Sequence, residues 1–82
     1  MMTKENILNR LHENFTNSKI EVHDMTGASN HFSLLIISDN FESISLINRH
    51  KKIHSIFKEE LTTEIHAFQI QALTPIEWSN KK

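Results

Sequence analysis

The fold is decided by residues 31–38, which read His-Phe-Ser-Leu-Leu-Ile-Ile-Ser. Four consecutive apolar residues, from Leu34 to Ile37, leave this stretch without a polar face. A strand that is apolar on both sides is covered on both sides, whereas a solvated strand alternates. The pattern therefore predicts a central or well-covered strand of a sheet.

Two further strands are predicted on either side of it in the chain. Residues 19–24 alternate apolar and polar positions, and residues 65–73 do the same. The alternating apolar positions are Ile20, Val22, Phe68, Ile70 and Ala72. A loop at residues 25–30 around Gly27 separates the first two strands, so we expect them to pair as an antiparallel hairpin.

The remaining segments have helical periodicity. Residues 3–15 predict an amphipathic helix capped by Thr3, with apolar positions Ile7, Leu8, Leu11 and Phe15. Residues 43 to about 61 predict helix again, and residues 48–50 could hold a turn between two shorter helices. The expected apolar stripe of this segment is Leu46, His50, Ile53, Phe57 and Leu61.

A last helical turn begins at Thr74. Threonine is the cap, Pro75 occupies the first helical position and Glu77 can reach back to the cap. We expect Trp78 to pack back onto the sheet. The expected fold class is α+β, in the order α-β-β-α-α-β, with a three-stranded sheet covered by helices on one face and a short C-terminal helical turn. With 82 residues we expect a single domain over residues 1–82.

Composition narrows the function. The chain has no cysteine, one glycine and a net charge of −1, so no thiolate can bind a metal and no global charge attracts nucleic acid or anionic membrane. No serine lies in a glycine-bracketed elbow, and Glu59 with Glu60 is most simply a solvated charged pair. We therefore expect a protein that is not an enzyme, with no membrane contact. Because no leader or membrane-length apolar run is visible, we expect it in the cytoplasm.

The candidate functional residues are histidines and a small basic cluster. His50 and His54 have ligand-compatible spacing, but the expected stripe makes His50 a partly buried structural residue and His54 a surface one. His66 opens the third strand at the edge of the core face, where pattern alone favours a structural role. The basic cluster, the only local patch that could meet phosphates, is Arg49, Lys51 and Lys52.

Several motifs together resemble the BolA family. They run from about residue 22 to residue 78, and no gap is needed after His31. The matching motifs are His31-Phe32, Ser38-Asp39, Phe41, Asn48-Arg49-His50, Glu59-Glu60-Leu61, Ile65-His66-Ala67, Thr74-Pro75 and Glu77-Trp78. The resemblance implies a fold like the type II KH domain, without its GxxG nucleic-acid clamp.

The resemblance also implies a function in iron–sulfur trafficking and iron homeostasis. Members of the family pair with monothiol glutaredoxins and share a 2Fe–2S cluster, to which the partner and glutathione supply thiolates. His66, in the Ile-His-Ala motif, is then the expected ligand from this chain, because imidazole can replace thiolate on one iron. We expect no cofactor in the isolated chain, which would be a monomer or weak homodimer.

The chain departs from the family where a second ligand is expected. One branch carries a cysteine in the loop between the first two strands, where this chain has Ala28, and the longer histidine-bearing loop of another branch is missing. His31 or His23 could take that role. The family is also described as transcriptional regulators of stress response and cell morphology. In this chain the DNA-binding surface would include Arg49, Lys51 and Lys52, and its binding would be weak.

Overall fold

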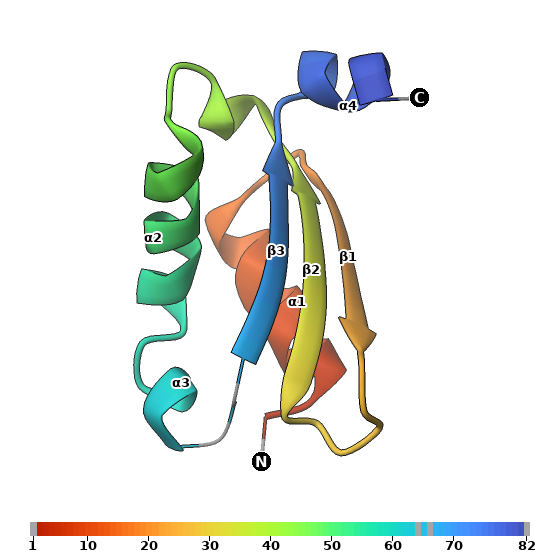
Figure 1. Cartoon of the computed structure of the whole chain (residues 1–82), viewed down its shortest axis with the longest axis vertical. Coiled ribbons are helices and arrows are strands. Elements are labelled where there is room, and N and C mark those ends of the chain that lie inside the picture. Colours follow the sequence, from red (N-terminus) through yellow and green to blue (C-terminus); the bar gives the residue numbers. More distant parts are fainter. Residues whose placement is uncertain (1, 64, 66, 82) are drawn as a thin grey trace.

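The secondary-structure elements follow the predicted order (Figure 1). The computed structural model describes residues 2–63, 65 and 67–81. The helices are α1 (Lys4–Asn14), the 3-10 turn η1 (Asp39–Phe41), α2 (Leu46–Ile56), α3 (Glu60–Thr63) and α4 (Pro75–Lys81). The strands are β1 (Lys19–Asp24), β2 (His31–Ile37) and β3 (Ala67–Leu73). The α+β class is confirmed, whereas the likeness to the type II KH domain stays a prediction.

The sheet has the order β1-β2-β3, so β2 is central, as its apolar sequence predicts. The β1–β2 hairpin is antiparallel, with Val22 opposite Leu34. The pairing of β2 with β3 is parallel, with Leu34 opposite Ile70. A parallel partner requires a long crossover, and here α2 and α3 provide it. The N-terminal ends of β2 and β3 therefore lie side by side.

One face of the sheet carries the hydrophobic core, and helices α1 and α2 cover it (Figure 1). Every second residue of β2 is buried on this face. The buried residues of this core are Met2, Ile7, Leu11, Phe15, Val22, Phe32, Leu34, Ile36, Phe41, Ile53, Phe57, Ile65 and Ala72. The predicted one-sided coverage by these helices is thus confirmed.

The opposite face of the sheet is open except at one end. Ile37 alternates with the core residue Ile36, yet it is only 7% exposed. The Lys19 ammonium of β1, the cross-strand partner of Ile37, lies 5.4 Å from the centre of the Trp78 ring. Helix α4 therefore folds back to this end of the sheet, as predicted, and we call the rest of this surface the open face.

The helix caps follow the sequence signals. Thr3 accepts a hydrogen bond from the Asn6 amide (3.2 Å), and Asn6 accepts one from the Thr3 amide (3.0 Å). At α4, the Glu77 amide donates to the Thr74 hydroxyl (3.2 Å) and the Thr74 amide donates to Glu77 (2.8 Å). Each pair of reciprocal hydrogen bonds forms a capping box, which satisfies backbone amides that a helix leaves unpaired in its first turn.

The predicted stripe of the long helix is wrong at its first half. Helix α2 is continuous through residues 48–50, and the chain turns at residues 57–59. Leu46 is 62% exposed and His50 is exposed, whereas Arg49 is 5% exposed. Ser45 caps the helix at Leu46, and in that position Arg49, four residues before Ile53, points inward. Hydrophobicity alone could not place a charged residue there.

The predicted third strand begins too early. Strand β3 starts at Ala67, and Ile65 before it is 2% exposed but belongs to no strand. Its amide donates to the carbonyl of Glu60 (2.9 Å), so it closes the α3 turn.

In the described part of the chain, no helix is long and apolar enough to cross a bilayer.

The observed orientation of α2 predicts a sharp difference between two apolar residues of the originally predicted stripe, Leu46 and Phe57. Phe57 is fully buried and packs edge-on against Phe68, with ring centres 5.2 Å apart. We expect Phe57→Ala to cost about 3–5 kcal/mol of unfolding free energy, because it leaves a cavity in the core. The control Leu46→Ala should change it by less than about 0.5 kcal/mol. Urea unfolding measures both, and equal losses would contradict the observed orientation of α2.

Candidate functional site

The first candidate region lies where β2 and β3 begin side by side. His31, the first residue of β2, is the register partner of Ala67, the first residue of β3. The Ala67 amide reaches the carbonyl of Asn30 (3.4 Å). His66, the expected ligand, lies outside the described residues. Its chain neighbours are Ile65, which is buried, and Ala67, which is fixed beside His31.

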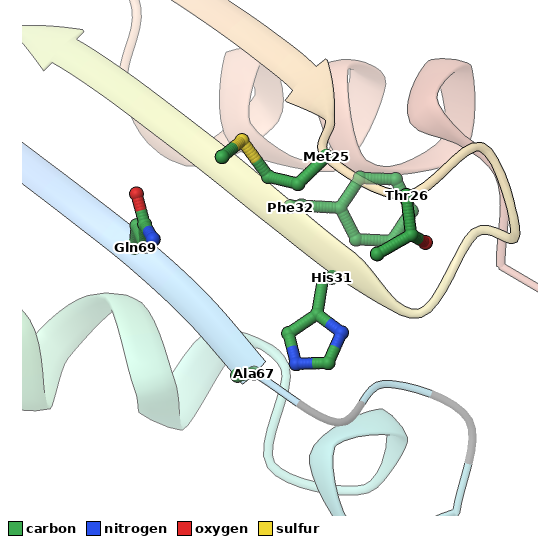
Figure 2. A pocket seen from close by; sticks show the side chains of 6 residues that line it. All are labelled: Met25, Thr26, His31, Phe32, Ala67 and Gln69. Carbon is green, nitrogen blue, oxygen red and sulfur yellow. The ribbon is translucent and has the colours of Figure 1, made fainter.

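A shallow pocket opens at this end of the open face. It has a volume of about 300 Å³ and is mostly apolar. Its lining residues are Met25, Thr26, His31, Phe32, Ala67 and Gln69. Figure 2 shows the His31 imidazole between the starts of β2 and β3, with Met25 on the other side of β2. The pocket thus combines an imidazole with apolar surface that can be covered by a partner.

The two candidates for a second ligand lie on the same face. His23 is the cross-strand partner of Ser33, and the Met25 amide donates to the His31 carbonyl (2.8 Å). His23 and His31 are therefore diagonal neighbours across the β1–β2 pair, and residues in this relation typically lie about 7–8 Å apart. His23 is largely exposed, and its Nε2 lies 3.7 Å from Glu21.

These residues fit part of a metal centre. Imidazole nitrogens are suitable ligands for one iron of a 2Fe–2S cluster, and the imidazole of His31 is part of the pocket lining. Among residues 2–63, 65 and 67–81, no three histidine, aspartate or glutamate side chains are grouped to hold a metal ion.

Asp24 organises the loop that borders the pocket, which the sequence analysis missed. Its carboxylate accepts hydrogen bonds from the amides of Thr26 (3.3 Å), Gly27 (2.9 Å) and Ser29 (3.1 Å). Gly27 has a φ of 76°, which glycine adopts at little cost. An aspartate shortly before a glycine is a recognised turn signal, and it could have identified Asp24. Ala28, where a cysteine was sought, is exposed on this loop.

Arg49 is not part of an exposed basic surface, contrary to the prediction. Its guanidinium is buried and lies 5.7 Å from the centre of the Phe41 ring. It donates to the carbonyls of Ile44 (2.9 Å) and Ala72 (2.9 Å) and to both carboxylate oxygens of Glu77 (2.6 and 3.2 Å). These four bonds use four of the five N–H donors inside the protein, and the burial of the side chain keeps phosphates away from it in this conformation.

Hydrogen bonding to Arg49 also lowers the pKa of its partner, Glu77. The hydrogen bonds from Arg49, with a further one from the Thr74 amide, lower the pKa of Glu77 to about 2. Lys51 and Lys52 remain exposed on α2, and the Lys52 ammonium lies 5.7 Å from the centre of the Phe15 ring. The exposed basic surface predicted from sequence is thus reduced to two lysines.

Comparisons with known proteins agree with one another. The family model "BolA-like protein" matches residues 6–77. The "DNA-binding transcriptional regulator BolA" of Escherichia coli K12 is 34% identical over 85 residues, covering 95% of this chain and 81% of that protein. "BolA-like protein 1" of Bos taurus is 40% identical over 52 residues, covering 63% of this chain.

A solved structure supports the same relationship. The crystal structure of a Bol-like protein from Babesia bovis has a TM-score of 0.86 and 32% identity, and the match covers 99% of this chain and 94% of that one. In contrast, this chain matches only 38% of the length of the Bos taurus protein. Most of that protein therefore lies outside the alignment.

The Arg49–Glu77 pair predicts a specific acid sensitivity. Because the pKa of folded Glu77 is about 2 and its ordinary value is 4.5, the carboxylate stabilises the fold above pH 4.5. This contribution should decrease as the pH falls from 4.5 towards 2. We expect wild type to be more stable than Glu77→Gln at pH 6, with the difference shrinking at pH 3. Urea unfolding at both pH values measures it, and a pH-independent difference would contradict the assigned pairing.

Proposed function

Because this chain belongs to the BolA-like family, we propose that it is a non-enzymatic cytoplasmic adaptor in iron–sulfur trafficking and iron homeostasis. In this proposal it binds a monothiol glutaredoxin and contributes His66 to a shared 2Fe–2S cluster. The observation that carries the proposal is the pairing of His31 with Ala67 beside an apolar pocket. This pairing places Ala67, the residue directly after His66 in the chain, beside the histidine His31.

The chemistry of the chain supports a shared cluster. The chain has no cysteine, so all thiolate ligands would come from the glutaredoxin and glutathione. Imidazole in place of thiolate raises the reduction potential of a 2Fe–2S cluster. His66 would be the principal ligand, and His31 is better positioned than His23 as a second one, because it lines the pocket.

The pocket supports an interface with a partner. Met25 is 53% exposed at its rim, and methionine adapts its shape to different contact surfaces. The hydrogen bonds of Asp24 hold the adjoining loop in a defined conformation. A pre-ordered apolar edge loses less conformational entropy when a partner covers it.

The first test of function is cluster assembly with single histidine variants. The full chain, a monothiol glutaredoxin and glutathione are combined anaerobically with iron and sulfide. We expect a heterodimer with visible absorption and circular dichroism different from those of the glutaredoxin alone. His66→Ala should remove this difference, because the cluster loses its imidazole ligand. His12→Ala, an exposed histidine on α1, is the matched control and should behave as wild type.

The same assay separates the alternatives. Unchanged spectra in His66→Ala would exclude His66 as a ligand. A change in His31→Ala or His23→Ala identifies the second ligand, whereas no change in either assigns it to the partner. A heterodimer without iron in Mössbauer or resonance Raman spectra would leave an interaction module that holds no cluster.

A second candidate function is DNA binding in transcriptional regulation. It is favoured by the 34% identity to a relative that is named as a DNA-binding transcriptional regulator. Lys51 and Lys52 on α2 would contact phosphates, while the burial of Arg49 leaves a smaller charged surface than predicted. With a net charge of −1, such binding would be weak and dominated by salt-sensitive phosphate contacts.

Salt dependence tests this second candidate. If Lys51 contacts a phosphate, Lys51→Ala should weaken binding to all sequences and reduce the slope of log K against log salt by about 1. Lys4→Ala, an exposed lysine on α1, is the control. Electrophoretic retardation over a salt series measures both. Absence of retardation at low salt would remove the DNA-binding candidate.

A further inference from the structure

Helix α2 carries two exposed histidines on its solvent side. His50 and His54 are both exposed, whereas Arg49 and Ile53, one position before each, are the buried residues of the helix. The sequence had suggested a turn at residues 48–50 and partial burial of His50. Because α2 is continuous from Leu46 to Ile56, the two histidines are instead one helical turn apart on one surface.

This spacing suits a chelate. Side chains four residues apart on a helix have Cβ atoms about 5–6 Å from each other. Neutral imidazole donates a nitrogen lone pair to zinc, copper or nickel. The helix backbone holds the two Cβ atoms at this spacing before any ion arrives, so binding by the second imidazole requires only a side-chain rotation.

The position within the helix also favours a cation. His54 lies in the last turn of α2, where the helix dipole is negative. The exposed lysines Lys51 and Lys58 lie nearby in the sequence and oppose a bound cation, so the affinity should be modest.

We propose that His50 and His54 form a binding site for a divalent late transition-metal ion such as Zn²⁺, with water completing the coordination. The site uses α2 alone and does not involve the pocket at the start of β2 and β3. It is independent of the glutaredoxin proposal. Bound metal would clamp the last turns of α2 and add positive charge beside Lys51.

Titration of the full chain with Zn²⁺, followed by amide and imidazole NMR shifts, tests the site without any partner. We expect His50 and His54 to respond together, at lower Zn²⁺ concentration than His12. His12 is the internal reference because it is an exposed histidine with no second histidine at helical spacing. Either His50→Ala or His54→Ala should raise the Zn²⁺ concentration required at the remaining histidine to that of His12.

The variants also give a second measurement. Both histidines are exposed, so neither substitution should unfold the protein. Zn²⁺ should raise the midpoint of thermal unfolding of wild type and of His12→Ala, but not of His50→Ala. The proposal is overturned if His50 and His54 respond only with His12, or if each single variant keeps the wild-type response.

Discussion

The rest of the structure depends on the hydrogen bonds of the buried Arg49 guanidinium. It joins helix α2 to the carbonyl at Ala72 near the end of β3 and to Glu77 of α4. A buried charge without partners is very costly, so the chain must bring α2, β3 and α4 together around it. The same contacts fix the rotation of α2, with Ile53 and Phe57 towards the core.

Most of the fold could be predicted because it follows from local patterns. The apolar run at residues 34–37 indicated a central strand, and Thr74-Pro75-Ile76-Glu77 indicated the start of α4. The burial of Arg49 could not be predicted in this way, because its partners are 5, 23 and 28 residues away. In the sequence, an arginine close to lysines looks like part of an exposed basic patch. Only its tertiary contacts show that it is buried.

The candidate site was predicted only in part for a related reason. The alternating pattern of each strand could not show whether His23 and His31 lie on the same face of the sheet. The observed register of β1 against β2 places them on one face. The parallel pairing of β2 with β3, which aligns His31 with Ala67, depends on the crossover through α2 and α3. The role of Asp24 consists of hydrogen bonds within a loop, which produce no periodic pattern, so its position shortly before Gly27 is the sequence signal for this role.

The two sides of α2 have different physical roles. The inner side is specified by buried contacts, so substitutions there change stability and any measured loss of binding would be indirect. The outer side, with His50, Lys51 and His54, makes little contribution to the core. Lys51 is therefore a cleaner probe of DNA binding than Arg49, because its substitution removes a charge and leaves the fold intact. A loss of DNA binding in an Arg49 variant would not identify a phosphate contact, since that residue holds α2 against β3 and α4.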